Sequence, residues 1–295
     1  MKINKKVVMF AGKGGVGKTT VSCATAVHFA LQGEKTLVIS TDPAPSLSDI
    51  FETKIGDKEK KLAENLYALE LSSGEVLRLW KQKFGDEIYE VISSFVDTEK
   101  SIVDYIGTAP GIDEEFMLYY IHELVMRKKY ERIIWDSAPM GHTLRLLNLP
   151  SRFIDHLNQA VKVYMKFNIK WGKRSIFDII DSWKKLAEEI VEFLKNETEI
   201  VAVTIPETLS TMQTERLVFE LHENNMNINY IVINNVIHEA CCEFHRQRML
   251  MQEGNIKRID EIKDKIDIEV TKIPSFSYEI KGLEKLEEVE KILFR

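Results

Sequence analysis

Short apolar runs alternate with longer amphipathic stretches along most of the chain. The runs have the length of strands, are rich in Val and Ile, and cover residues 7–11, 36–40, 66–71, 132–136, 200–205, 230–234 and 268–273. Strands that are almost continuously apolar and alternate with helices are typical of a parallel sheet covered by helices on both faces. The pattern therefore predicts an α/β fold, doubly wound around a mainly parallel sheet.

Two stretches, at about 85–126 and 151–195, interrupt this alternation with helical patterns that contain no convincing strand. Each carries apolar residues at helical spacing, such as Ile88, Val91 and Ile92 in the first and Ile179 and Trp183 in the second. Such stripes usually face a core, although they also suit an apolar binding surface. Because no linker or repeat separates these parts, we interpret residues 1–295 as one domain with an inserted helical subdomain.

A glycine-rich segment follows the first apolar run and precedes a helical pattern. Residues 12–19 read G-K-G-G-V-G-K-T, which matches the phosphate-binding loop G-x-x-x-x-G-K-[ST] in its required strand–loop–helix context. Glycines let backbone N–H groups approach phosphates, and a helix N-terminus adds partial positive charge. We expect the ATP-binding segment to comprise Gly12, Lys13, Gly14, Gly15, Val16, Gly17, Lys18, Thr19 and Thr20.

Three residues in this loop have expected roles in ATP hydrolysis. Lys18 should bridge the β- and γ-phosphates, and the Thr19 hydroxyl should bind Mg²⁺. Lys13 is not required by the minimal pattern; it is either a solvated surface lysine or a second catalytic lysine. The loop resembles the deviant Walker A class, whose additional lysine reaches the nucleotide of a partner subunit, and this resemblance implies a homodimer.

Two aspartates stand at the ends of predicted strands, where ligands bind in α/β folds. Asp136 ends the run 132–136 and is the candidate acid for the outer coordination sphere of Mg²⁺; the alternative is an N-cap of the following helix. Asp42 follows the run 36–40 and precedes Pro43. We hypothesise that Asp42 orients or deprotonates the attacking water, and the alternative is a turn aspartate before proline.

Taken together, the motifs resemble the arsenical-pump ATPase superfamily, and within it the single-unit ATPases that deliver tail-anchored membrane proteins. The resemblance covers nearly the whole chain and rests on residues 11–20, 40–49, 110–114, 136–145, 205–207 and 232–235. It implies that 42–49 and 136–142 are switch segments that sense the γ-phosphate. It also implies that Asn234 binds adenine, with Pro274 and Phe276 near the base. Pro45 and Met140 depart from the usual switch sequences.

The same resemblance implies a zinc site, because targeting members commonly carry a C-x-x-C pair that joins two subunits through a shared ion. Here Cys242 and His245 keep that spacing, and thiolate and imidazole both suit tetrahedral zinc. Two such pairs across a homodimer would supply four ligands. Unliganded helix residues are the alternative.

The net charge and the cysteine count exclude some classes of function. A formal net charge of -6 argues against a nucleic-acid partner, and three cysteines are too few for a secreted disulfide framework, so we expect a cytoplasmic protein. Two functions are open. One is a targeting ATPase that binds a transmembrane segment and has a membrane receptor as a partner, and the other is an ATPase that drives an arsenite pump. No cysteine lies between Cys23 and Cys241, so ligands for a soft metalloid are lacking there. A regulatory or partitioning ATPase is a third interpretation.

Overall fold

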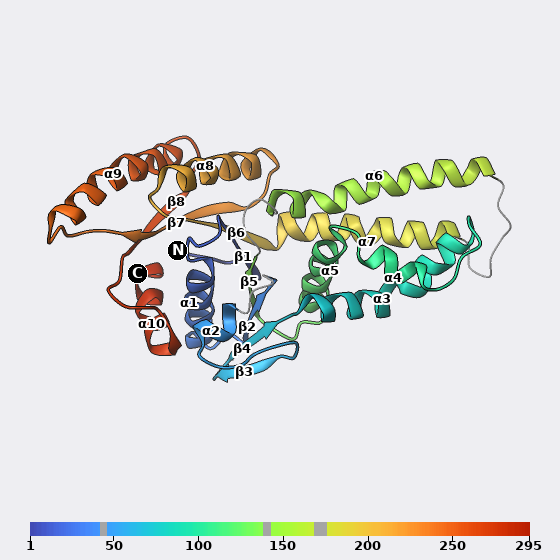
Figure 1. Ribbon diagram of the computed structural model, residues 1–295, viewed down its shortest axis with the longest axis horizontal. Coiled ribbons are helices and arrows are strands. Elements are labelled where there is room, and N and C mark those ends of the chain that lie inside the picture. Colours follow the sequence, from blue (N-terminus) through green and yellow to red (C-terminus); the bar gives the residue numbers. More distant parts are fainter. Residues whose placement is uncertain (42–45, 138–142, 168–175) are drawn as a thin grey trace. The chain divides into compact units, whose positions relative to one another are not determined.

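The structure is a computed structural model, and it describes residues 1–41, 46–137, 143–167 and 176–295 of the 295-residue chain (Figure 1). It divides into two compact units. The α/β unit comprises Met1–Leu71, Lys128–Leu144 and Lys195–Arg295, and the helical unit comprises Ser72–Arg127 and Arg145–Leu194. Among the described helices, none combines the length and apolarity needed to cross a membrane.

The described part of the α/β unit contains one eight-stranded sheet. Its strands are β1 (Val7–Ala11), β2 (Thr36–Ser40), β3 (Lys60–Ala63), β4 (Leu66–Glu70), β5 (Arg132–Asp136), β6 (Thr198–Thr204), β7 (Ile228–Val236) and β8 (Glu269–Pro274), in the order β3-β4-β2-β5-β1-β6-β7-β8. All neighbours are parallel except β3 and β4, which are antiparallel. The predicted doubly wound, mainly parallel sheet is confirmed.

The edge strand β3 was not predicted. Its sequence, K-K-L-A, is short and half charged, and none of its residues is fully buried, so little apolar pattern marks it. By contrast, every residue of β1, β2 and β5 is buried, because helices cover both faces of the sheet there. The apolar pattern therefore revealed the central strands and the edge strand β8, and missed the edge strand β3.

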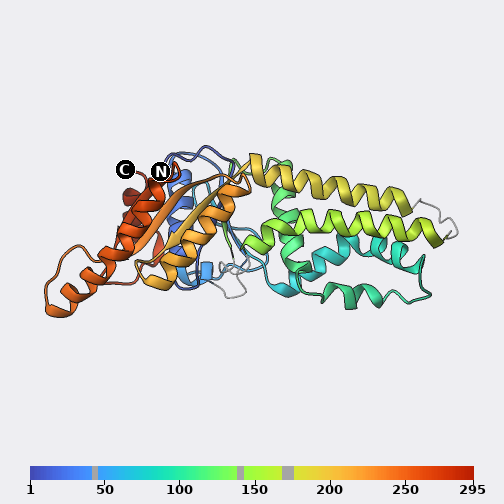
Figure 2. The ribbon, with the colours of Figure 1, turned by 90° about the horizontal axis from the view of Figure 1, so that it is seen from above.

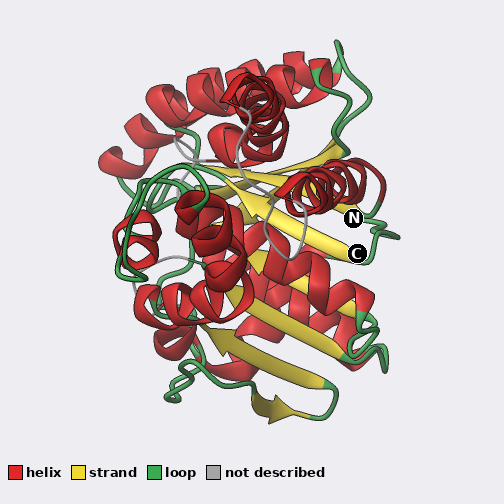
Figure 3. Ribbon diagram, turned by 90° about the vertical axis from the view of Figure 1, so that its right-hand side faces the viewer, coloured by secondary structure: helices red, strands yellow, loops and turns green. Residues whose placement is uncertain are grey.

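Helices lie on both faces of this sheet (Figure 3). Helices α1 (Lys18–Leu31) and α10 (Gly282–Leu293) lie together on one face, whereas α8 (Thr208–Glu223) and α9 (Glu243–Lys263) lie on the other (Figure 1). The short helix α2 (Ser46–Ile50) follows β2. The His28 ring of α1 stacks on Phe294 with centroids 3.6 Å apart, and its Nδ1 lies 2.6 Å from Glu290 of α10.

The helical unit contains α3 (Ser73–Ser93), α4 (Ile102–Gly107), α5 (Ile112–Met126), α6 (Thr143–Phe167) and α7 (Ile176–Asn196) (Figure 2). Helix α3 begins where Ser72 accepts a hydrogen bond from the backbone N–H of Glu75, an ordinary N-cap. The apolar stripes expected at about 85–126 and 151–195 fall on these helices. The description of the chain as one domain with insertions stays a prediction.

Candidate functional site

The pairing of β1 with β5 positions the candidate nucleotide site. The two strands are parallel neighbours, with Phe10 opposite Asp136, so the loop after β1 and the aspartate emerge at the same edge. On the other side of β1, Ala11 lies opposite Ala202 of β6. The loop that joins β1 to α1 therefore begins between two strand ends, the usual position of a ligand site in an α/β sheet.

Two glycines of the loop are required by their surroundings. A Cβ atom on Gly12 would lie 2.2 Å from the carbonyl oxygen of Val203, so no side chain fits there. Gly17 has a φ of 93°, and a Cβ atom on it would lie 2.2 Å from Nδ2 of Asn234. The glycines thus let the backbone pass close to its neighbours and turn into the helix.

Helix α1 presents its N-terminus to this loop. Its N-cap is Gly17, which supplies no side-chain hydrogen bond to the first-turn N–H groups. Uncapped N–H groups and the helix dipole together favour an anion. Lys18 is only 7% exposed, and its Nζ donates to the backbone oxygen of Lys13 at 3.3 Å, so the ammonium is folded back over the loop. This arrangement suits a polyphosphate.

The residues expected to hold Mg²⁺ lie together. The Thr19 hydroxyl donates to Oδ2 of Asp136 at 2.8 Å, and Asp136 is only 1% exposed. A hydroxyl and a carboxylate are the hard oxygen ligands that Mg²⁺ prefers, so this donor set fits the ion.

Hydrogen bonds hold the strand ends around Asp136. Ser137 donates through Oγ to the carbonyl oxygen of Phe10 at 2.7 Å. The backbone N–H of Thr41 donates to the Asp136 carbonyl at 3.2 Å, and Nε1 of Trp135 donates to the Thr41 hydroxyl at 3.2 Å. The ends of β1, β2 and β5 are therefore tied to one another.

The predicted catalytic Asp42 follows Thr41 directly and lies outside the described residues, as do Pro45 and Met140. Its catalytic role stays a prediction.

Asn234 of β7 donates through Nδ2 to the carbonyl oxygen of Val16 at 3.0 Å, so it supports the loop from the side. Pro274 ends the neighbouring strand β8 opposite Val236, and Phe276 packs partly buried against the core. The two strands bring these residues to one end of the sheet. Their role in binding adenine stays a prediction.

The other loop residues differ in exposure. Val16 is buried, Lys13 and Thr20 are half-buried, and Gly14 and Gly15 are exposed. The backbone at the tip of the loop is therefore exposed, while the apolar side chain of Val16 is buried beneath it.

Glu70 is a site residue that sequence reasoning missed. It ends β4, accepts from the backbone N–H of Leu47 at 2.9 Å and from the Ser48 hydroxyl at 2.5 Å, and so anchors α2 at the far end of the predicted first switch. Its position in the sequence resembles that of Asp136, because both are carboxylates near the end of an apolar run; Glu70 precedes the last residue of the run 66–71.

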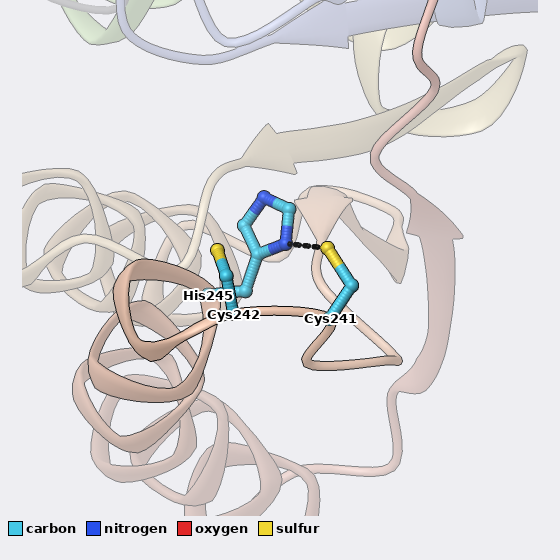
Figure 4. A group of neighbouring side chains, drawn as sticks. All are labelled: Cys241, Cys242 and His245. Atoms are coloured by element: carbon cyan, nitrogen blue, oxygen red, sulfur yellow. Dashed lines mark hydrogen bonds between the residues drawn. The ribbon is translucent and has the colours of Figure 1, made fainter.

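A cluster of metal-ligating side chains lies at the start of α9 (Figure 4). It consists of Cys241, Cys242 and His245, whose ligand atoms all lie within 4.8 Å of one another. Sγ of Cys241 lies 2.9 Å from Nδ1 of His245. Cys241 was not among the predicted ligands, because the C-x-x-H spacing drew attention to Cys242 alone. Two thiolates and an imidazole suit zinc.

The helical unit contains an apolar, partly open cavity of about 250 Å³. Its walls come from α3, α4, α5, α6 and α7, and their aromatic members are Trp80, Phe84, Phe116, Tyr119, Phe153 and Trp183. Glu115 of α5 is the one carboxyl side chain among the described lining residues, and burial raises its pKa to about 7. Sequence reasoning missed Glu115, because no local pattern distinguishes it from its acidic neighbours.

A parallel sheet with a phosphate-binding loop after β1 and an aspartate at the end of the adjacent β5 defines the P-loop nucleoside triphosphatases. The family model of the anion-transporting ATPases matches residues 5–295, and the chain belongs to this family. It is therefore an ATP-hydrolysing enzyme.

Similar proteins cover nearly the same length. "ATPase ASNA1 homolog 1" of Paramecium tetraurelia is 33% identical over 98% of this chain and 92% of its own. "ATPase GET3" of Komagataella phaffii is 34% identical over 98% of this chain and 89% of its own. "Putative arsenical pump-driving ATPase 2" of Aquifex aeolicus is 33% identical over 98% of this chain and 99% of its own.

Replacing Glu115 with Gln should stabilise the protein in a pH-dependent manner. The folded-state pKa of about 7 exceeds that of an unfolded carboxyl, so wild-type stability falls as the pH rises through this interval. The variant avoids this loss and should unfold with a free energy higher by about 2 kcal/mol at pH 8, and nearly unchanged at pH 4. Urea unfolding at both pH values measures the difference.

The matched control is Asp113→Asn, an exposed acid in the same first turn of α5, which should show no such stabilisation. Equal stabilities of wild type and Glu115→Gln at pH 8 would contradict the prediction.

Proposed function

We propose that this protein is a cytoplasmic, Mg²⁺-dependent ATPase that binds and delivers the transmembrane segment of tail-anchored membrane proteins. The observation that carries the proposal is an apolar, aromatic-walled cavity on the same chain as a phosphate-binding ATPase site. A cavity of this size takes only part of a membrane helix, but its apolar walls suit the side chains of such a helix, and ATP hydrolysis can drive release of the segment. The resemblance of the sequence motifs to targeting ATPases supports the same function.

Different residues of the nucleotide site have different roles in ATP hydrolysis. Loop N–H groups and Lys18 bind the phosphates, while Thr19 and Asp136 would hold Mg²⁺, which supplies charge neutralisation at the phosphate oxygens. Asp42 accepts a proton from water as the water oxygen bonds to the γ-phosphorus. The bond between that phosphorus and the bridging oxygen then breaks, leaving ADP and phosphate.

A conformational change at the nucleotide site can be passed to the helical unit along the chain that joins them. Residues 137–142 connect Asp136 directly to the start of α6, and Pro150 and Phe153 of α6 line the apolar cavity. A change at Asp136 can therefore be passed along this segment to a wall of the cavity. Such coupling requires that ATP and ADP make different contacts in two conformations.

The enzyme acts as a homodimer that ATP closes, with Lys13 reaching the nucleotide of the partner subunit. The half-buried position of Lys13 beside the exposed loop tip is compatible with this role. A membrane receptor that takes over the client is a further expected partner. Cys242 and His245 of both subunits would hold one shared zinc ion, which would join the subunits.

The function is tested by capture of a transmembrane segment of about 20 apolar residues by the purified protein, with ATP and with ADP. We expect selective, nucleotide-dependent capture, and no capture of a segment interrupted by charges. Phe153→Ala should weaken capture by about 10-fold, because it removes an aromatic wall. Phe95→Ala is the matched control, since Phe95 lies in the same unit but does not line the cavity.

No capture by a protein with normal ATPase activity would refute the targeting function. It would favour a pump-driving ATPase, the function named for the Aquifex aeolicus relative, or a regulatory ATPase.

Lys13→Ala should abolish ATP-dependent closure of the dimer while largely preserving nucleotide affinity. We expect the rate of hydrolysis to fall by about 10³-fold, the order of effect of a cation supplied to the transferring phosphate by a partner. Scattering with ATP and a turnover assay measure the two effects. Lys58→Ala, at an exposed lysine outside the loop, is the control. Closure that survives in Lys13→Ala refutes the role across the dimer.

The zinc proposal predicts different zinc contents for substitutions of the two adjacent cysteines. If Cys242 and His245 form the shared site, Cys242→Ser should remove the zinc and weaken the dimer, whereas Cys241→Ser should retain about one ion per dimer. Metal analysis of protein purified without chelator measures both. The proposal fails if the wild type contains no zinc. It also fails if Cys241→Ser loses the ion as completely as Cys242→Ser.

A further inference from the structure

The apolar cavity of the helical unit contains one feature that apolar binding does not explain. Glu115 contributes a carboxyl group to walls that are otherwise almost entirely aromatic and aliphatic. A carboxylate removed from water is costly unless it has a partner. Burial is the cause of its raised pKa, and no neighbouring charge contributes.

The charge of the α5 N-terminus does not account for Glu115. Asp113 and Glu114 already place two carboxyl groups in the first turn of α5, where they favour the helix dipole. The dipole also favours the ionised form of a carboxyl, which lowers a pKa, yet the pKa of Glu115 is raised to about 7. Desolvation therefore outweighs the dipole at this position.

The other polar groups around the cavity bind one another. Tyr119 of α5 forms a hydrogen bond with Lys83 of α3, whose Nζ lies 5.3 Å from the Tyr119 ring centroid. Glu87 of α3 accepts from Nε1 of Trp183 of α7 at 2.8 Å. The described lining residues from α4 and α6 carry no charge, so the described walls provide no cation for Glu115.

The size of the cavity limits its occupant. A volume of about 250 Å³ lies below the ~300–1,000 Å³ of typical small-molecule sites, and it is far too small for a whole membrane helix. One long side chain of a bound segment fits better. Lysine combines a four-carbon stem, which packs on apolar surfaces, with a compact positive charge, and aromatic faces also attract cations.

We propose that this cavity binds one lysine side chain of an otherwise apolar client segment, with its stem against the aromatic walls and its ammonium group on the Glu115 carboxylate. The inference rests on the proposed targeting function and adds a specificity determinant to it. The ion pair relieves the desolvated carboxylate, so a client with a lysine at the matching position binds more tightly than a purely apolar client.

Protonation of Glu115 makes this preference depend on pH. Below pH 7 the carboxyl is mostly neutral, and lysine binding must first remove its proton, which weakens the binding of the lysine client. Above pH 7 the carboxylate is already formed. The preference for lysine should therefore grow between pH 6 and pH 8.

The test compares two peptides of about 20 apolar residues that differ at one position near the end, with lysine in one and norleucine in the other. Norleucine retains the stem and lacks the charge. We expect the full-length protein to bind the lysine peptide about 10-fold more tightly at pH 8, and less than about 3-fold more tightly at pH 6. Glu115→Gln should lose the preference, and Asp113→Asn should keep it.

The outcomes distinguish this inference from the function on which it rests. Equal binding of both peptides to the wild type at pH 8 overturns the lysine site and leaves the targeting function intact. A lysine preference that survives in Glu115→Gln also overturns it. If neither peptide binds, both the targeting function and the lysine site are refuted. The Glu115→Gln variant removes a half-buried charge and is expected to fold, so its loss of preference is informative.

Discussion

The parallel pairing of β1 with β5 and β6 is the constraint on which the nucleotide site depends. It brings Asp136 beside the loop that leaves β1, so that the Thr19 hydroxyl reaches the carboxylate at 2.8 Å. It also presses Gly12 against the carbonyl of Val203, which leaves no room for a side chain. The loop conformation, the helix start and the metal-binding residues all follow from the register of these three strands.

The two units of the chain provide different chemical environments for a ligand. The α/β unit offers buried strand ends, backbone N–H groups and charged side chains, which suit a polyphosphate. The helical unit offers aromatic and aliphatic walls around one partly desolvated carboxyl. The fixed polar donors that phosphate contacts require and the apolar walls of the cavity therefore lie in different units of the chain.

Two of the four connections between the units follow strands that end in or near a carboxylate of the candidate site. Glu70 anchors α2 and is followed shortly by α3, and Asp136 holds Thr19 and is followed by the segment that leads into α6. Both of these connections to the helical unit thus leave the sheet next to a carboxylate of the candidate site. These two connections join the candidate nucleotide site to α3 and α6 along the chain.

The sequence by itself determined the central strands, the phosphate-binding loop and the placement of Asp136 at a strand end, because each is encoded by residues close together in the chain. The edge strand β3 was missed, since its K-K-L-A sequence has little apolar pattern. Only the tertiary structure decided the contacts of Glu70, the joining of Cys241 to the Cys242 and His245 pair, and the isolation of Glu115. Burial and partnership depend on residues distant in sequence, so the neighbouring carboxyl side chains of Asp113 and Glu115 differ in burial through what packs around them.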